Sequence, residues 1–304
     1  MKILVTGSGG FLGRSFGHYS VHAGHQVLGL SRSSQPSVDW PGEHLGIDAG
    51  QADLAPIVEE FNPDMIFHAA GPASVGKSFG SPVDDFRAGV VSWANVLDSV
   101  RRSGRKPKIV FPSSAAVYGN PAKLPVSEQA MLAPISPYGF HKLMCETIAT
   151  EYSQCFGLDV IIARIFSLFG PRQRRLLVWE VFNQIVGDSP TIDIEGTGSE
   201  ARDFLHVDDF SLGIHLLVEH GLTGVVNVGS GRTCSVIELV RILQDILGTA
   251  KRVHCLNRSR PGDPVSWQAD MKQFEKRTNG RFTPRALVES LSACIAVWRR
   301  EPQS

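Results

Sequence analysis

Short apolar segments alternate with stretches of helical periodicity through the first half of the chain. Six of these segments have the length and composition of strands, and they lie at residues 2–6, 25–30, 44–48, 64–69, 108–113 and 159–166. Helices are expected between them, from Gly10 onward and over about 51–61, 83–103 and 137–156. Because most of the strands are apolar throughout, they should be buried on both faces. The pattern therefore predicts an α/β fold, a doubly wound parallel sheet covered by helices on both sides.

The pattern becomes looser after Gly170-Pro171. Two further strands are expected at 191–196 and 225–229, and two further helices at 235–247 and 284–299. We interpret residues 1–168 as the sheet domain, with return contributions from about 203–231. Residues 169–304 then form a smaller, partly interleaved C-terminal lobe, which suits a chain of 304 residues.

Charge and cysteine content exclude several classes of function. Lys+Arg and Asp+Glu both total 30, so no excess charge favours nucleic acid or an anionic membrane surface. No apolar run reaches the roughly 18 residues that cross a bilayer, and the N-terminus enters a strand directly, without a secretory signal. The five cysteines are an odd number without a C-x-x-C, which indicates reduced thiols rather than disulfides or a metal site. A cytoplasmic protein without a metal is expected.

The segment TGSGGFLG at residues 6–13 follows the first strand and opens a helix. Gly7, Gly10 and Gly13, in the spacing G-x-x-G-x-x-G, permit the tight turn and close backbone approach that a pyrophosphate needs at a helix N-terminus. Phe11 and Leu12 lie between the last two glycines and are candidate cofactor contacts as well. The segment predicts a Rossmann-type dinucleotide-binding domain.

The end of the second strand indicates which dinucleotide binds. In NAD-specific folds an acidic residue there holds the ribose 2′-hydroxyl. Here Ser31-Arg32 stand at that point, so a hydroxyl and a guanidinium lie where a 2′-phosphate would bind. This favours NADP(H), and NAD(H) stays an alternative because Arg32 can also be a solvated loop residue. Asp48, after the third strand, is a candidate contact to the adenine edge.

Residues 71–78, GPASVGKS, match the phosphate-loop pattern G-x-x-x-x-G-K-S. A phosphate loop needs a helix that continues from its Lys-Ser, but Gly80 and Pro82 follow within four residues. We therefore expect no ATP or GTP site in this segment.

The segment SPYGFHK contains a tyrosine and a lysine four residues apart, Tyr138 and Lys142. A helix that starts at Pro137 places both on one face. A phenol is too weak an acid to act near neutral pH unless a positive charge stabilises its phenolate, and Lys142 supplies that charge. Ser114, at the end of the fifth strand, can donate to the same substrate oxygen. The three residues predict an oxidoreductase-type catalytic site.

From residue 2 to about 292, the chain resembles the extended short-chain dehydrogenase/reductases, the nucleotide-sugar epimerase and dehydratase family. The resemblance rests on TGSGGFLG, HAAGPASV (68–75), SSAAVYG (113–119), SPYGFHK, RIFSLFGP (164–171), ARDFLHVDD (201–209), NVGSG (227–231) and RPGDPVSWQAD (260–270). It implies that Tyr138 is the acid/base, that Lys142 binds the nicotinamide ribose and that Ser114 orients the sugar oxygen.

The resemblance also implies a nucleotide-diphosphate sugar as substrate. Arg202 and Arg260 would grip its diphosphate, because the guanidinium fork matches phosphate oxygens. The remaining candidate contacts are Ser113 and Ser167 for the substrate, and Ala69 and Ala70 for the cofactor. The cluster Arg172, Arg174 and Arg175 is interpreted as a solvated loop.

Three departures from the family's pattern narrow the reaction. Ala115-Ala116 stand where the 4,6-dehydratases carry Asp-Glu, and alanine cannot transfer a proton, so 4,6-dehydration is not expected. Ser167 replaces the family's usual asparagine, which leaves the sugar undetermined. Ser31-Arg32 differ from the acidic strand end of NAD-retaining 4-epimerases and resemble the NADPH-using 4-keto-6-deoxysugar reductases.

The leading hypothesis from the sequence is thus an NADPH-dependent reductase of a nucleotide-diphospho-4-keto-6-deoxyhexose, with Tyr138 as proton donor. The alternative is a nucleotide-sugar 4-epimerase of the UDP-glucose type, whose cofactor stays bound. A non-catalytic NADP-binding regulator is a third hypothesis, disfavoured because Tyr138 and Lys142 are both present. The family often dimerises through two helices, for which 83–103 and 137–156 are the candidates, so a homodimer is expected.

Overall fold

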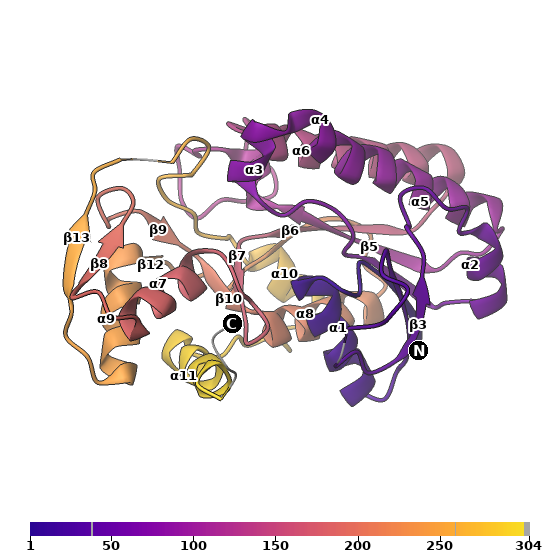
Figure 1. Ribbon diagram of the computed structural model, residues 1–304. Helices are drawn as coiled ribbons and strands as arrows, with labels where there is room; N and C mark the ends of the chain where they lie inside the picture. Colours follow the sequence, from indigo (N-terminus) through magenta and orange to yellow (C-terminus); the bar gives the residue numbers. More distant parts are fainter. Residues whose placement is uncertain (38, 259, 301–304) are drawn as a thin grey trace.

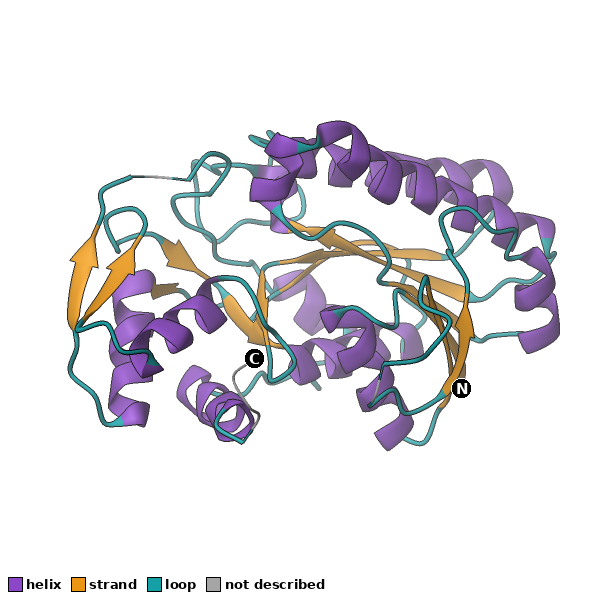
Figure 2. Cartoon of the chain, in the orientation of Figure 1, coloured by secondary structure: helices purple, strands orange, loops and turns teal. Residues whose placement is uncertain are grey.

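The computed structural model describes residues 1–37, 39–258 and 260–300. Its centre is a seven-stranded parallel sheet in the order β11-β6-β5-β4-β1-β2-β3 (Figures 1 and 2). The strands are β1 (Lys2–Thr6), β2 (Gln26–Ser31), β3 (Glu43–Gly46), β4 (Met65–His68), β5 (Lys108–Ser114), β6 (Val160–Ile165) and β11 (Gly224–Val228). The predicted doubly wound α/β sheet is confirmed, and β11 joins it from the C-terminal half of the chain, beside β6.

Helices cover both faces of the sheet. One face packs against α2 (Ala55–Phe61), α5 (Ser92–Arg102) and α6 (Pro137–Phe156), and the other against α1 (Phe11–His22), α8 (Val207–Glu219) and α10 (Lys272–Arg277). Successive residues of β1 show the division, because Ile3 and Val5 are buried in one cluster while Leu4 is buried in the other. Each strand is therefore enclosed on both sides, which explains its continuous apolar sequence.

The C-terminal half adds small sheets and a third hydrophobic core. Its two-stranded pairs are β7 (Ser167–Phe169) with β10 (Phe204–His206), β9 (Ala201–Arg202) with β12 (Cys234–Ser235), and β8 (Thr191–Ile194) with β13 (Arg252–Cys255). Helices α7 (Leu177–Val186), α9 (Val236–Leu247) and α11 (Leu287–Trp298) enclose that core. Figure 1 shows this assembly at one end of the long axis, beyond the carboxyl edge of β5 and β6.

Several helices differ from the sequence-based expectation. The segment expected as one helix over 83–103 is α4 (Pro82–Phe86), a π-helical turn η1 (Arg87–Val91) and α5. Helix α2 starts at Ala55 rather than near 51, because the Asp53 carboxylate accepts from the Ala55 amide and Pro56 follows. The helical elements that the sequence pattern did not predict are α3 (Val75–Gly80), the 3₁₀ turn η2 (Ala115–Tyr118), α7, α8 and α10, and the unpredicted strands are β7, β9, β10, β12 and β13.

Burial explains why α8 was not predicted. Ten of its thirteen residues are buried, including Asp209, Ser211 and His215, between the sheet and α1. A helix buried almost all round has no polar face, so its sequence lacks the amphipathic periodicity that marks a surface helix.

The described helices contain no segment long and apolar enough to cross a bilayer. The five cysteines are free thiols, and Cys145, Cys234 and Cys294 are buried in the hydrophobic cores. Their packing agrees with the interpretation of most cysteines as core residues.

Two buried histidines should make folding sensitive to acid. Burial lowers the pKa of His68 to about 3, with a further contribution from the Lys142 charge. Burial also lowers the pKa of His215 to about 4, where the ring lies against Phe16 and meets the Ser20 hydroxyl at 3.0 Å. Below the ordinary histidine pKa of about 6.5, the unfolded chain binds protons that the folded chain cannot, so each group removes stability as pH falls.

We predict that the free energy of unfolding decreases between pH 6.5 and 4.5, with each histidine contributing up to about 1.4 kcal/mol per pH unit. His215→Phe keeps the stacked ring and removes the proton, so its decline should be shallower, although loss of the Ser20 partner lowers its stability at pH 7.5. Urea titrations at fixed temperature measure this. The exposed His22→Gln serves as the control and should keep the wild-type slope. Parallel curves for wild type and His215→Phe would contradict the assignment.

Candidate active site

The turn between β1 and α1 packs so tightly that two positions need glycine. Gly7 has φ 73°, and a Cβ there would lie 2.5 Å from the Ala70 amide nitrogen. A Cβ on Gly13 would overlap the Gly7 carbonyl. The Gly7 amide donates to the Leu30 carbonyl at 2.8 Å, which fixes the turn across the ends of β1 and β2. The predicted cradle is thus a close-packed turn at the carboxyl edge of the sheet.

The cradle fits a dinucleotide. Gly10 is the N-cap of α1 and offers no side chain to the first-turn amides, which include those of Phe11 and Leu12. Ser8 is 2% exposed, and its hydroxyl has no hydrogen-bond partner among the described residues. Free amides at a helix N-terminus and an unpartnered hydroxyl are the donors that a pyrophosphate requires.

The adenosine side of the cradle has no carboxylate at the end of β2. The Ser31 hydroxyl lies 2.9 Å from His44 Nε2, and Ser31 faces Gly9. Arg32 is exposed and makes no hydrogen bond or ion pair with the described residues. Asp48 Oδ1 accepts from the Gly50 amide at 2.9 Å, so this carboxylate closes the turn after β3.

Helix α6 carries Tyr138 and Lys142 on one face. Ser136 caps the helix by accepting from the Gly139 amide, and Pro137 begins it. The Lys142 ammonium donates to the Pro112 carbonyl at 2.7 Å and lies 5.7 Å from the centre of the Tyr138 ring. Both side chains line a small cavity with Ala70, which follows Ala69 at the end of β4. The structure therefore brings the predicted tyrosine, lysine and β4 residues together.

Ser114 ends β5, and the η2 turn that follows it packs closely against α6. A Cβ on Gly139 would lie 2.7 Å from the Ala116 carbonyl oxygen. The Ser114 hydroxyl accepts from the Ala116 amide at 3.1 Å, so its own proton stays available to a ligand. Residues 71–78, which match the phosphate-loop pattern, contact the start of α6. The hydroxyl of the buried Ser78 on α3 accepts from the Tyr138 amide at 3.1 Å. Helix α3 ends two residues later, at Gly80.

A buried ion pair that sequence reasoning missed connects β6 to α6, the helix that carries Tyr138 and Lys142. Arg164 on β6 donates to both carboxylate oxygens of Glu146 on α6, the shortest contact being 2.7 Å, and each side chain is 5% exposed. Ser113 is buried and donates to the same carboxylate. The hydroxyl of Ser113, a predicted substrate contact, is thus bound by Glu146 inside the protein. Arg164 inside the apolar strand VIIARI was the available signal, because a charge in a buried strand requires a partner.

Arg202 and Arg260, the two predicted diphosphate contacts, both act electrostatically on Asp263. The Arg202 guanidinium lies 5.9 Å from the Trp267 ring centre and donates to the Ala201 carbonyl. Burial raises the pKa of Asp263, whereas the charges of Arg202 and Arg260 act to lower it, so Asp263 lies near both arginines. Arg260 also pairs with Glu180 on α7 at 3.5 Å. The two arginines thus belong to one charged cluster.

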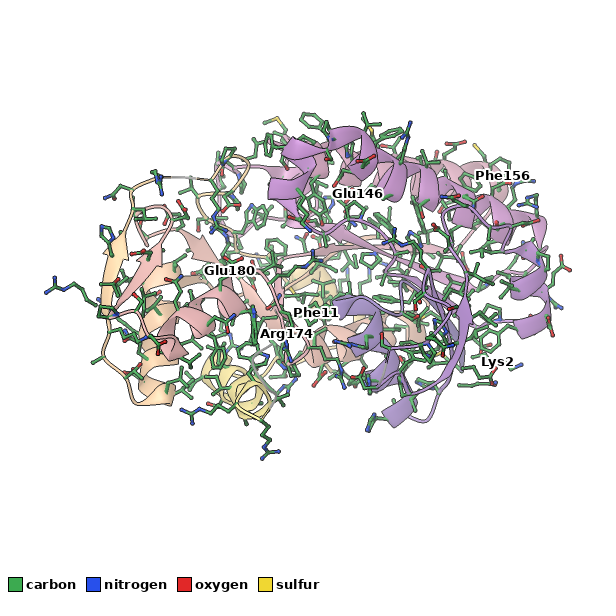
Figure 3. All side chains as sticks on the ribbon, viewed as in Figure 1. Lys2, Phe11, Glu146, Phe156, Arg174 and Glu180 are labelled. Atoms are coloured by element: carbon green, nitrogen blue, oxygen red, sulfur yellow. The ribbon has the colours of Figure 1, made fainter. Side chains whose placement is uncertain are left out.

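The loop after β7 agrees in part with the expected solvated loop, since Arg174 and Arg175 are exposed while Arg172 is half-buried. Arg172 pairs with Asp39 at 2.9 Å, and Arg174 lies 4.6 Å from the Trp179 ring centre while donating to the Pro171 carbonyl. Ser167 begins β7 and is half-buried. Figure 3 places Phe11, Arg174 and Glu180 in the middle of the molecule, where the sheet meets the C-terminal helices.

Comparison with known proteins agrees with this geometry. The sequence matches the model of the NAD dependent epimerase/dehydratase family over residues 3–229. It is 31% identical over 287 residues to the UDP-glucose 4-epimerase of Azospirillum brasilense, covering 86% of this chain and 82% of that protein. It is 30% identical over 293 residues to the Bacillus subtilis protein YtcB, named an uncharacterized UDP-glucose epimerase, covering 91% of each. 

A solved structure shows the same overall similarity. The UDP-glucuronic acid 4-epimerase of Bacillus cereus, in complex with UDP-glucuronic acid and NAD, superposes with a TM-score of 0.89 at 25% identity. The match covers 99% of this chain and 100% of that one.

The close approach of Gly139 to Ala116 yields a prediction. Gly139→Ala should push the first turn of α6, and with it Tyr138, away from Ser114. We expect turnover to fall at least about tenfold, with a loss of about 1–3 kcal/mol in the free energy of unfolding. Steady-state kinetics and urea unfolding measure the two effects. Gly76→Ala on α3 is the matched control, since a Cβ there meets no atom within 4 Å. Wild-type turnover in Gly139→Ala would contradict the role of this contact.

Proposed function

The chain belongs to the NAD-dependent epimerase/dehydratase family, and on that premise we propose that it is a UDP-sugar 4-epimerase that keeps its dinucleotide bound. The observations that support the proposal are that Tyr138 and Lys142 line one cavity with Ala70, and that Lys142 donates to the carbonyl of Pro112, two residues before Ser114. Ser114 is followed by the buried pair Ala115 and Ala116. Neither Ala115 nor Ala116 has a side-chain group that could protonate a leaving hydroxyl. Proton transfer at a sugar oxygen is supported, and elimination of water is not.

In this proposal the dinucleotide, when bound, supplies an acceptor and donor for the hydride at sugar carbon 4. Tyr138 would remove the proton from the 4-hydroxyl and later return it to the same oxygen, once the 4-keto sugar has turned its opposite face toward the hydride donor. Lys142, held by the Pro112 carbonyl, keeps a positive charge beside the phenol. Ser114 donates to the same sugar oxygen and stabilises its negative charge.

We propose NAD as the resident cofactor, held by Gly7, Gly10, Phe11, Leu12 and Gly13. The family's cofactor and the NAD in the Bacillus cereus structure support this over the NADP(H) that the sequence favoured. The unpartnered Ser8 hydroxyl and the uncapped first turn of α1 are suitable donors for its pyrophosphate. Ser31 and His44 are the polar groups beside the expected position of the adenosine ribose.

We assign the substrate to the C-terminal residues 169–304 and the dinucleotide to residues 1–168 with 203–231. Arg202 and Arg260 would hold the diphosphate, and the charges of both act on the Asp263 carboxyl. The UDP-sugars named for the relatives support a UDP-linked sugar. Ser167, at the start of β7, is a proposed sugar contact.

The 4-keto reductase is the second candidate function. Arg32 favours it, because its guanidinium is exposed, has no hydrogen-bond or ion-pair partner among the described residues, and follows a strand end that lacks a carboxylate. Such a group suits a 2′-phosphate. The two functions differ in net redox chemistry. An epimerase returns its hydride to the sugar, whereas a reductase consumes one NADPH per product.

We predict that the purified protein releases NAD on denaturation, near one per subunit by chromatography. It should convert a UDP-hexose into its 4-epimer without added cofactor or lasting change at 340 nm. UDP-glucose, UDP-N-acetylglucosamine and UDP-glucuronic acid form the first panel. Tyr138→Phe should lose at least about 10²-fold in kcat, because the acid/base is removed. Consumption of NADPH with a 4-keto nucleotide-sugar, by a protein purified without cofactor, would establish the second candidate instead.

We further propose a homodimer formed through α4, η1 and α6, which pack side by side at the edge of the molecule (Figure 1). Their outward side chains include exposed apolar residues that the sequence did not reveal as a stripe. These are Val83 at 59%, Val91 at 47%, Phe140 at 50% and Met144 at 43% exposure. An apolar surface shared by neighbouring helices suits burial against a second copy.

The double variant Val91→Asp/Met144→Asp should shift the molar mass in light scattering from two chains to one, because charges disfavour burial of this face. Val288→Asp, on α11 and 50% exposed, is the control and should stay dimeric. A wild-type protein with the mass of one chain would refute the dimer.

A further inference from the structure

A single carboxylate joins three separate parts of the chain beside the cofactor cradle. Asp39 lies 3.3 Å from Arg14 Nη1, 3.3 Å from His18 Nε2 and 2.9 Å from Arg172 Nε. Arg14 and His18 belong to α1, Asp39 to the segment between β2 and β3, and Arg172 to the loop after β7. The contacts are partly shielded from water, since the arginine side chains are 26% and 27% exposed and Asp39 is 43% exposed.

The segment that carries Asp39 lies against the adenosine side of the cradle. A Cβ on Gly9 would lie 3.8 Å from the Ser37 hydroxyl and 3.8 Å from the Ser31 side chain, so both serines flank the turn. Trp40 anchors the segment by packing its ring against β2. A Cβ on Gly29 of that strand would lie 2.5 Å from the ring. In a Rossmann domain the ribose of the adenosine lies beside this strand end. A departing adenosine therefore has to pass the segment.

The loop that carries Arg172 is fixed in the C-terminal half. The Pro171 carbonyl accepts from the Trp298 indole of α11 at 2.7 Å. Gly170 packs beside Phe11, since a Cβ on Gly170 would lie 3.4 Å from the Phe11 ring. Asp39 thus ties a segment at the cofactor to a loop that the rest of the protein holds in place.

Resting on the proposed cofactor-retaining function, we propose that Asp39 with Arg14, His18 and Arg172, the Asp39 clasp, slows release of the dinucleotide. Asp39 acts as a positioning residue here. Opening the segment would break its contacts with α1 and with the loop after β7 together. An enzyme that reuses one dinucleotide gains from such a restraint, whereas a reductase must exchange its cofactor at every turnover.

Charge also shapes this site. The pKa of Asp39 is lowered although burial opposes this, because Arg172 donates to it and Arg14 lies nearby. Burial and the Arg172 charge lower the pKa of His18, so the two arginines supply the positive charge near neutral pH. Removing Asp39 would leave Arg14, Arg172 and Arg174 to attract a pyrophosphate through space. That electrostatic effect would slow release in an Asp39 variant, the opposite of what the clasp predicts.

The test is the rate of dinucleotide release without any sugar. The protein is loaded with NADH, or with NADPH if denaturation releases NADP(H), and chased with excess oxidised dinucleotide while the fluorescence of the bound reduced form is followed. The variants are Asp39→Asn, Arg172→Gln, their double combination and Asp39→Glu. Asp159→Asn is the matched control, because its carboxylate forms a single ion pair with Lys108 at 2.7 Å and is 50% exposed.

We expect release about tenfold faster in Asp39→Asn and in Arg172→Gln, no further acceleration in the double variant, partial recovery in Asp39→Glu and no change in Asp159→Asn. Added NaCl should speed release in wild type more than in Asp39→Asn.

Three results would overturn the clasp. Unchanged release in Asp39→Asn is the first. Opposite shifts in Asp39→Asn and Arg172→Gln would assign the effect to through-space charge. Lower melting temperatures of the cofactor-free variants, with wild-type release rates, would assign these contacts to folding alone. Because no sugar is present, the clasp can fail while epimerase turnover is normal, and turnover can be absent while the clasp is confirmed.

Discussion

The buried ion pair between Arg164 and Glu146 holds the elements that carry the predicted catalytic side chains. Arg164 comes from β6, Glu146 from α6 one turn after Lys142, and Ser113 from the end of β5 joins the same carboxylate. The Arg164 guanidinium also donates to the Tyr118 hydroxyl of η2. Breaking a buried pair typically costs about 3–5 kcal/mol because one charge is left without a partner. The sheet edge, η2 and α6 are thereby held in one arrangement.

This restraint matters because the predicted catalytic residues come from separate elements. Ser114 stands at the end of β5, while Tyr138 and Lys142 stand on α6, and nothing in the chain's local geometry keeps them together. The Gly139 contact with the Ala116 carbonyl sets how closely the two elements approach. The ion pair between Arg164 and Glu146 restrains movement of α6 along the sheet. The close packing of Gly139 and the buried ion pair together restrain the relative positions of η2 and α6, as the proposed proton transfer requires.

Sequence reasoning found the sheet and most candidate site residues because those features depend on local pattern. Continuous apolar strands, the glycine turn and a tyrosine and lysine at helical spacing can each be read within a few residues. It did not find α8, whose burial on all sides removes periodicity. Nor did it find the partners of Arg164 and Arg172, since Glu146 and Asp39 lie 18 and 133 residues away in the chain. Ion pairs between residues far apart in the chain produce no recognisable spacing in the sequence.

The prediction of the cofactor was likewise restricted to local sequence. Ser31 and Arg32 were interpreted from a local rule that links the residue at the end of β2 to the 2′ position of the ribose. The structure adds two facts that the rule does not contain. Arg32 has no hydrogen-bond or ion-pair partner within the described residues, and Ser31 meets His44 from β3.

How long the dinucleotide stays bound is a separate property, because it depends on what must move before the cofactor can leave. Asp39 connects the segment beside the ribose to the loop after β7. A protein that must exchange its cofactor gains nothing from this connection. The proposed clasp and the choice between epimerase and reductase are therefore separate questions, which separate measurements answer.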